Sequence, residues 1–352
     1  MKRIAAAVST AVVCAATGIF SLSMFVTDGF SSNPESPSAL RKTLLHTQQS
    51  LSLSLGQDCI NGVFITDDRL FVRHDFYSSE AVRENVDAVN AYAQRNSAPL
   101  YWLVAPTAAG IYADTIPVGA SQASELSMMN NAMEQLDPSV TWVDVNSTLY
   151  DARDAYLYYR NDHRWTTEGA FHAYKAAIRK LGLSNLGRDR FASSIFTTEF
   201  RGDLAQISEC DVFDTDIVEL FSCADAPPIA SIIGTKSGER YSSFYQTDQT
   251  EPLAVFLPER EPVIQVETEV HNNKRLVVLC DEYGSNFVPF LTNHFRSLTV
   301  VNLTIAEASD VPSISDDGST QVLLLSSADT LSKHGGLRIL SQTELPKNQD
   351  SP

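Results

Sequence analysis

Short apolar runs rich in β-branched and aromatic residues recur along the chain, and helical patterns separate several of them. Continuous apolar runs of this length are typical of strands that are covered on both faces. Two segments, 82–93 and 170–181, show the spacing of amphipathic helices. The alternation of strands and helices predicts an α/β domain with a mostly parallel sheet and helices on both faces. The runs are 62–65, 101–104, 142–145, 276–279, 298–301 and 322–325.

One long segment, 188–270, interrupts this alternation. It contains Pro227-Pro228, Gly234 and scattered Ser and Thr, but no clear helical period. Proline and glycine at such density favour turns and irregular backbone. We interpret the segment as an irregular or β-rich insertion in the α/β domain rather than as a domain of its own.

The N-terminus has the charge pattern of an exported protein. Lys2 and Arg3 precede an uncharged stretch that runs from Ile4 to Val26. As a helix this stretch would reach ~34 Å, enough to cross a hydrocarbon core of ~30 Å. The basic residues favour a cytoplasmic N-terminus, which places the rest of the chain outside the cytoplasm. A cleaved signal peptide, giving a secreted protein, is the alternative, although its apolar region is usually only about 7–15 residues long.

The domain organisation follows from these segments. Residues 1–28 are the predicted transmembrane anchor or signal segment. Residues 29–55 are rich in Ser, Pro, Asn and Gln and are predicted to form a stalk. The α/β domain is expected at 56–335, and a flexible tail at 336–352.

Composition excludes several classes of function. The chain has 352 residues, 43% of them hydrophobic, so it can form a large core. A net charge of −17 argues against a nucleic-acid partner. The sequence lacks a phosphate-binding loop and any Cys or His spacing typical of zinc, so neither a cofactor nor a metal is predicted. Export permits a disulfide, for which Cys210 and Cys223 are the best pair, whereas Cys280 is predicted to be a buried apolar residue.

The first segment that could form a catalytic or binding site is the loop from Asp162 to Trp165. Thr166 or Thr167 is a suitable N-cap for the helix that follows. Asp, His, Arg and Trp in a loop before a helix are compatible with a catalytic site. A purely structural interpretation stays open, in which the aspartate holds the turn, the tryptophan packs beneath it and the arginine pairs with a carboxylate.

The second such segment is 279–291. Pro289 is tolerated only near a helix start, which predicts the order strand, tight turn with Gly284, and helix from about Asn286. A side chain in such a turn lies at the carboxyl end of a parallel sheet, where α/β proteins bind ligands. A nucleophilic Ser often occupies this position in hydrolases. The alternative is an acidic loop that only caps the next helix.

Together these segments resemble the DHHW family, exported bacterial relatives of the SGNH-like acetyltransferases that O-acetylate alginate. The resemblance also includes 103–107, 200–204 and 287–291, in the same order along the chain, and covers roughly 61–325. It implies an SGNH-hydrolase-like, flavodoxin-like parallel sheet. It further implies a Ser–His–Asp site that acts on acyl esters of sugars, so the partner would be a surface glycan or an acylated sugar.

Two positions depart from the family pattern. In the Asp-x-His-Trp motif, Asp162 and Trp165 match, but Arg164 stands at the His position and His163 at the intervening one. At the position of the Ser, which the family places between an Asp and an aromatic residue, this chain has Glu282. Arginine keeps its proton at any working pH, and a carboxylate has no proton to lose, so neither replacement preserves the chemistry.

The double replacement suggests a specific geometry. If the two positions face each other, Arg164 and Glu282 form an ion pair in place of the catalytic hydrogen bond, and neither charge is left unpaired. Trp165 and Tyr283 would line the cleft as exposed rings suited to sugar stacking. Ser285, near the helix start, is expected to be an N-cap.

Routes to retained chemistry stay open beside this interpretation. His163 could supply a base, Ser285 a nucleophile, or Glu282 could activate a water molecule with help from Asp162 or His163. We therefore predict a membrane-anchored, extracytoplasmic SGNH-like domain of cell-envelope or exopolysaccharide context. It would be catalytically impaired and would bind a glycan or an envelope protein. The alternative is an active carbohydrate O-acetyltransferase or acetylesterase with an altered site.

Overall fold

The computed structural model describes residues 59–342 except 75, 117–122, 210–212 and 259. The predicted anchor (1–28) and stalk (29–55) lie outside the described residues. Cys210 does so too, which leaves its predicted disulfide with Cys223 open. Within the described part of the chain, no helix is both long and apolar enough to span a membrane.

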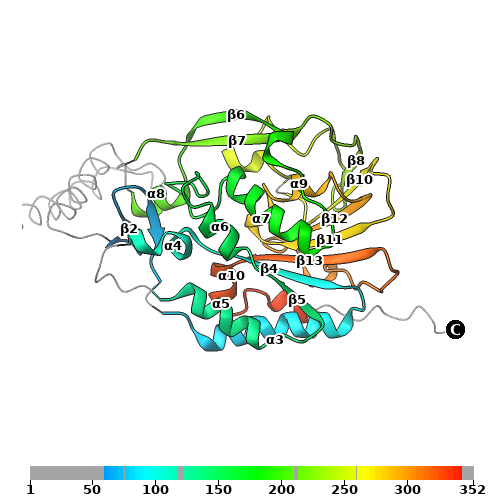
Figure 1. The fold of residues 1–352 in the computed structure, drawn as a ribbon, viewed down its shortest axis with the longest axis horizontal. Coiled ribbons are helices and arrows are strands. Elements are labelled where there is room, and N and C mark those ends of the chain that lie inside the picture. Colours follow the sequence, from blue (N-terminus) through cyan, green and yellow to red (C-terminus); the bar gives the residue numbers. More distant parts are fainter. Residues whose placement is uncertain (1–58, 75, 117–122, 210–212, 259, 343–352) are drawn as a thin grey trace, which may run out of the picture.

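An eight-stranded mixed sheet forms the centre of the molecule (Figure 1). In spatial order its strands are β5 (Val140–Val143), β4 (Leu100–Ala105), β13 (Thr320–Ser327), β11 (Arg275–Cys280), β12 (Ser297–Asn302), β10 (Val263–Thr268), β8 (Ile229–Gly234) and β9 (Arg240–Tyr241). The first five strands are parallel, and the last three continue the sheet in antiparallel pairing. Each parallel strand comes from one of the predicted apolar runs, so the predicted α/β fold is confirmed.

The strand pairing differs in two places from what the apolar runs and the predicted insertion suggest. The run at 62–65 forms β2 (Val63–Ile65), which pairs with β1 (Cys59–Ile60) and β3 (Leu70–Val72) in a separate antiparallel sheet. The predicted insertion is β-rich, but β8, β9 and β10 from it extend the central sheet. Only β6 (Phe191–Phe200) and β7 (Asp216–Cys223) form a two-stranded sheet of their own. An apolar run predicts a strand, but strand pairing decides which sheet it joins.

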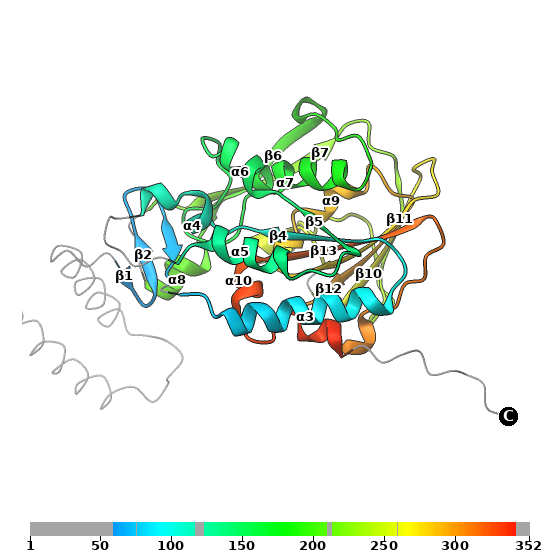
Figure 2. The same cartoon turned by 60° about the horizontal axis from the view of Figure 1, so that its bottom comes forward.

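Helices cover both faces of the central sheet (Figures 1 and 2). Alternate residues of a strand point to opposite faces, so Trp102 of β4 packs in one core and Leu103 in the other. The first core includes α3 (Ser79–Arg95), α5 (Glu125–Glu134) and α10 (Ala328–Ser332). The second includes α4 (Ala108–Ile111), α6 (Asn146–Asp151), α7 (Thr167–Lys180) and α9 (Val288–Leu291). Cys280 is buried in the second core, as predicted.

The remaining elements are short. They are α8 (Asp203–Ser208) and the 3₁₀ turns η1 (Ala113–Thr115), η2 (Arg188–Arg190), η3 (Pro252–Val255), η4 (Glu282–Gly284), η5 (Ala308–Asp310) and η6 (Arg338–Ser341). Leu337 and Leu340 are fully buried in the same core as α3. The expected start of a flexible tail at 336 is therefore wrong, because these two leucines fasten the chain to the domain as far as η6.

Candidate functional site

The two predicted segments meet at the carboxyl edge of the parallel strands. The loop before α7 ends at Thr166, whose hydroxyl caps the helix by accepting a hydrogen bond from the Gly169 amide. The other loop follows β11 and begins with Asp281 and η4. The Trp165 indole links the loops, because its Nε1 donates to the Tyr283 carbonyl at 3.0 Å. This is the edge at which ligands bind in α/β sheets.

Close packing fixes the turn after β11. A Cβ on Gly284 would lie 2.4 Å from the Cys280 Sγ, so only glycine fits beside the strand end. Asp281 holds the turn, since its Oδ1 accepts from the Tyr283 amide at 3.1 Å and its Oδ2 from Thr330 Oγ1 at 2.7 Å. The predicted order of strand, tight turn and helix is confirmed, although α9 begins at Val288.

The main partner of Arg164 is Asp162. Its Nε donates to Oδ1 and its NH2 to Oδ2, both at 2.7 Å, and the Asp162 side chain is fully buried. Burial alone would raise the pKa of Asp162, but the Arg164 hydrogen bonds and charge outweigh it and hold the pKa well below its usual range. The pair is therefore ionised, and Asp162 orients the Arg164 guanidinium.

The two replaced positions do face each other, as the sequence predicted. Arg164 NH1 lies 3.8 Å from Glu282 Oε2, which is an ion pair but not a hydrogen bond. The direct partner of Glu282 is instead His163, whose Nε2 lies 2.8 Å from Oε1. The predicted bridge thus exists as the weaker of two contacts on the Glu282 carboxylate.

His163 sits between two carboxylates. Its Nδ1 lies 3.0 Å from Asp203 Oδ1, and its Nε2 contacts Glu282. Burial alone would lower the pKa of His163, but hydrogen bonds to Asp203 and Glu282 and the charge of Asp162 raise it to about 10. Burial likewise opposes ionisation of Glu282, yet His163 lowers the pKa of Glu282 below its usual value. At neutral pH the site therefore holds an imidazolium between two carboxylates.

Both aromatic residues of the site are buried, and the expectation that they are exposed stacking surfaces is wrong. Trp165 is 1% exposed and Tyr283 fully buried. Their rings meet edge to face with centroids 5.2 Å apart, and Trp165 also stacks on Phe287. Their polar atoms are satisfied within the protein: the indole donates to the Tyr283 carbonyl and to Asn286 Oδ1, and the Tyr283 hydroxyl donates to the His163 carbonyl.

A pocket opens beside these charges. It has about 330 Å³ of free space, including the solvent at its mouth, and Arg164, Glu282 and Ser285 supply polar groups to it. Leu253 of η3 and Phe256, directly after η3, form its apolar wall. Ser285 does not cap α9, whose first turn has no side-chain cap, so the expected N-cap role is wrong. The hydroxyl of Ser285 instead lines the pocket.

Sequence reasoning missed Asp203 as a site residue. Its signal was the segment Phe200-Arg201-Gly202-Asp203-Leu204, which contributed to the resemblance without a role for its carboxylate. Gly202 allows the contact, because a Cβ there would lie 2.4 Å from the Asn161 carbonyl and from the Asp162 Cβ. The Asp203 amide in turn donates to Asp162 Oδ2 at 3.1 Å. Close approach of these two backbones brings the carboxylate to His163.

Three of these residues are placed so that they could hold a cation. One ligand atom each of Asp162, His163 and Asp203 lies within 4.8 Å of the others. Both Asp162 oxygens already accept hydrogen bonds from Arg164, however. A metal at this point would have to displace that guanidinium, so the donor set fits an ion pair better than a metal.

Comparison with known proteins agrees with this architecture. Residues 62–218 match the family model described as SGNH hydrolase-like domain, acetyltransferase AlgX. A DHHW family protein from Eubacterium siraeum superposes with a TM-score of 0.65 at 20% identity, covering 80% of this chain and 96% of that one. Bacillus cereus PatB1, solved with a sulfonyl adduct, superposes with a TM-score of 0.63 at 14% identity, covering 79% and 97%.

No curated protein matches the sequence. The similarity to the solved structures concerns the fold, and the family model covers the Asp162–Trp165 loop but ends before Glu282. The predicted resemblance is confirmed: residues 62–218 match the SGNH hydrolase-like domain model of acetyltransferase AlgX, and the fold is similar to that of a DHHW family protein.

Proposed function

We propose that the protein is a catalytically impaired SGNH-like domain that binds a cell-surface glycan. It would be held at the outer side of the membrane by its N-terminal segment, in which Lys2 and Arg3 precede the apolar stretch. The observation on which the proposal rests is His163, held between two carboxylates with its pKa raised to about 10.

The proposed loss of catalytic activity follows from the protonation states of His163, Glu282 and Arg164. A Ser–His mechanism needs a neutral imidazole that takes a proton from a hydroxyl. His163 is protonated at neutral pH, and Glu282 at the nucleophile position is an ionised carboxylate. Arg164, at the family's His position, keeps its proton as well. At the two family positions, transfer of an acyl group through a serine ester therefore has neither its nucleophile nor its base.

The same groups are suited to binding hydroxyl groups. Glu282 is 45% exposed and offers acceptors, while Arg164 is 22% exposed and offers the NH1 donors that Asp162 does not use. Charged side chains that are already hydrogen-bonded are pre-organised, which lowers the cost of ordering them when a ligand binds. The resemblance to the acetyltransferases that O-acetylate alginate, together with the match to the acetyltransferase AlgX model, supports a carbohydrate ligand.

One observation favours the second candidate, an ester hydrolase with an altered site. Glu282 is accessible and hydrogen-bonded to His163, which is the geometry of a carboxylate that could orient and deprotonate water. Its lowered pKa weakens it as a base, so we rank this function second.

Activity assays on the full-length protein in detergent separate the two functions. Hydrolysis of 4-nitrophenyl acetate and acetyl transfer to oligosaccharides would be measured for the wild type, Glu282→Gln and the double variant Arg164→His with Glu282→Ser. We expect an inert wild type and a gain of activity in the double variant only, because it restores both family positions. Arg190→His with Asp225→Ser, a change at an exposed ion pair elsewhere, is the matched control.

Binding is measured in parallel on the same protein, with a panel of acidic and neutral polysaccharides. Retention on at least one of them, weakened by Glu282→Ala, is expected. A wild type that turns over esters and loses this activity in folded Glu282→Gln would establish the hydrolase instead. A wild type that neither turns over esters nor binds any polysaccharide would overturn both functions.

A further inference from the structure

A buried carboxylate outside the pocket, that of Asp216, holds the chain segment that leads into the site. Asp216 is the first residue of β7 and is 3% exposed. Its Oδ1 accepts hydrogen bonds from the Arg160 amide at 3.0 Å and from the Tyr156 hydroxyl. Its Oδ2 accepts from the Asn161 amide at 2.9 Å and from Asn161 Nδ2 at 3.2 Å. All of these donors lie directly before Asp162 in the chain.

The chain folds back on itself here as a narrow hairpin. The Thr166 amide donates to the Leu157 carbonyl at 2.8 Å, and the Tyr159 amide donates to the Arg164 carbonyl at 3.3 Å. These bonds close the hairpin and leave residues 160–163 at its tip. The two backbone amides that bind the carboxylate therefore belong to the tip, next to the charged residues of the site.

The ribbon of β6 and β7 also supplies the carboxylate on the far side of His163. Asp216 pairs with Phe200 in the register of the ribbon, and Asp203 follows Phe200 by three residues. The Asn161 carbonyl accepts a hydrogen bond from an amide of α8 at 3.1 Å. Asp216 thus lies where the tip of the hairpin meets the segment that carries Asp203.

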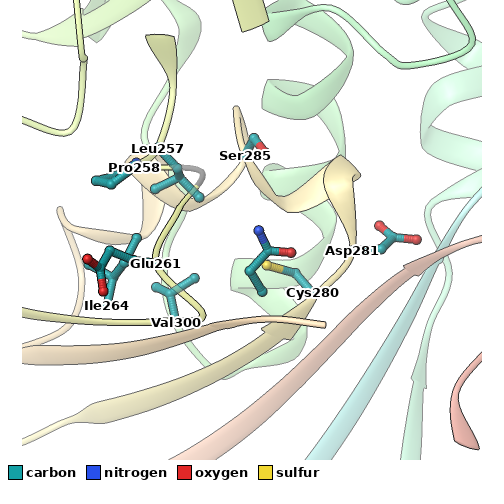
Figure 3. Close-up of a pocket in the computed structure, with 9 residues that line it drawn as sticks. Leu257, Pro258, Glu261, Ile264, Cys280, Asp281, Ser285 and Val300 are labelled. Atoms are coloured by element: carbon teal, nitrogen blue, oxygen red, sulfur yellow. The ribbon is translucent and has the colours of Figure 1, made fainter. Parts of the chain in front are cut away.

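Glu282, on the other side of His163, is held by a different carboxylate. Figure 3 shows the Asp281 carboxylate directed away from Ser285. Asp281 Oδ2 accepts a hydrogen bond from the Ser327 amide at 2.6 Å, which fastens the turn after β11 to the end of β13. The distance between the imidazole and the Glu282 carboxylate therefore depends on two separate anchors, one for the turn and one for the hairpin.

We propose that Asp216 is a positioning residue, which sets the place of His163 between Asp203 and Glu282 without touching a ligand. A carboxylate can accept on both oxygens at once, so it fixes two consecutive peptide groups of the tip. Fixing these peptide groups fixes the direction in which the chain enters Asp162 and His163. The inference concerns the geometry of the site and does not depend on which ligand the site takes.

A merely structural carboxylate would have a different effect. Its loss would lower the unfolding free energy equally at every pH, because the contacts of His163 would be unchanged. Against the effect of burial, hydrogen bonds to Asp203 and Glu282 raise the pKa of His163. Loss of a positioning residue weakens these contacts and should therefore lower the pKa of His163. The Tyr283 hydroxyl still donates to the His163 carbonyl at 2.7 Å, so the tip should shift rather than unfold.

Imidazole NMR on the full-length protein in detergent measures this pKa. Asp216→Asn keeps the volume of the side chain but replaces one acceptor oxygen by a donor, so a buried donor of the tip loses its partner. We expect a roughly tenfold or greater loss of proton affinity at His163. Asp214→Asn, the same change at an exposed residue two positions earlier, is the matched control and should leave His163 unchanged.

Further variants separate geometry from charge. Asp216→Glu keeps the charge but moves the carboxylate by one methylene group, and it should also lower the pKa of His163. A shift in Asp216→Asn that is absent from folded Asp216→Glu would be an effect of charge and would overturn the inference. Tyr156→Phe, at a half-buried position, removes one hydrogen bond to Asp216 without a change of charge and should give a smaller shift. A His163 that titrates as in the wild type in every folded variant also overturns the inference.

Urea unfolding provides a second readout. The decrease in stability between pH 6 and pH 10 should be smaller in Asp216→Asn than in the wild type, because the pKa of His163 lies closer to its value in the unfolded chain. An equal loss of stability at both pH values would show a merely structural role.

The result is separable from the proposed function. If the pKa of His163 falls as expected while no polysaccharide binds, only the proposed function fails. If a polysaccharide binds while His163 is unchanged in the folded variants, only the further inference fails.

Discussion

His163 Nε2 and Glu282 Oε1 lie 2.8 Å apart, so Glu282, at the family's nucleophile position, is hydrogen-bonded to the neighbour of the family's base position rather than to that position itself. The contact joins the protonated His163 ring to the ionised Glu282 carboxylate. On the other side of the ring, Nδ1 lies 3.0 Å from Asp203 Oδ1. A catalytic hydrogen bond must let its proton move during the reaction, whereas this arrangement stabilises one protonation state. The site therefore favours charge pairing over proton transfer.

The first prediction concerns stability at alkaline pH. The pKa of His163 is about 10 in the folded protein, and about 6.5 is expected in the unfolded chain. Its stabilising contribution is therefore complete below pH ~6.5 and is lost as the pH rises towards 10. We expect a loss of about 1–3 kcal/mol, less than the full shift implies, because Glu282 and Asp203 are 45% and 40% exposed.

The measurement is urea unfolding from pH 6 to pH 10, with imidazole NMR to locate the titration. His163→Gln should lack this part of the pH dependence. A His163 ring that titrates near pH 6.5 would contradict the assigned protonation state.

The second prediction concerns a buried carboxyl group in a lower pH range. Glu125 accepts hydrogen bonds from the Thr107 amide at 2.8 Å and from its hydroxyl at 2.6 Å. Burial nevertheless raises the pKa of Glu125 to about 7. A raised carboxyl pKa means that the folded state binds the extra proton, so stability should fall by about 2–3 kcal/mol as the pH rises from ~4.5 through 7.

Glu125→Gln should flatten the profile in that range and leave the alkaline range of His163 unchanged. Glu134→Gln, an exposed residue on the same helix, serves as the control. Identical profiles for Glu125→Gln and the wild type between pH 4.5 and 7 would show that Glu125 does not cause the effect.

The third prediction concerns the bidentate pair of Arg164 and Asp162. Arg164→Ala leaves the fully buried Asp162 without its partner, which should cost about 3–5 kcal/mol of unfolding free energy. Adding Asp162→Asn removes the uncompensated charge and should recover part of the loss. Denaturant unfolding of the single and double variants gives the coupling between the two residues. Additive effects would mean that the pair is not coupled as the geometry indicates.

The fourth prediction concerns the backbone contact that brings Asp203 to the site. Gly202→Ala places a Cβ against the Asn161 carbonyl and the Asp162 Cβ, neither of which can move freely. We expect a loss of about 1–3 kcal/mol and a lower pKa for His163, because Asp203 moves away from it. Gly187→Ala is the matched control, with similar backbone angles and only the flexible Asp189 carboxylate nearby. If the two substitutions change the unfolding free energy and the pKa of His163 equally, close packing at Gly202 does not position Asp203.

The sequence by itself determined the elements and the chemical departure of the site. The apolar runs predicted the five parallel strands, because a strand buried on both faces needs a continuous apolar sequence. Pro289 and Gly284 predicted the turn after β11, since backbone restrictions are local. The replacements at Arg164 and Glu282 were visible because the family motif fixes which residue types the chemistry requires.

Only the tertiary structure decided how these residues are paired. Asp203 is 40 residues from His163, and Gly202 brings it close through a packing contact that leaves no periodic signal. Trp165 and Tyr283 are buried. The sequence could not show this, because an aromatic residue in a loop can pack in a core or lie on the surface. Glu282 is hydrogen-bonded to His163 rather than to Arg164, because two nitrogens of the Arg164 guanidinium already donate to the buried Asp162. Local sequence fixes which groups are present, but the distances between distant loops decide which charges meet.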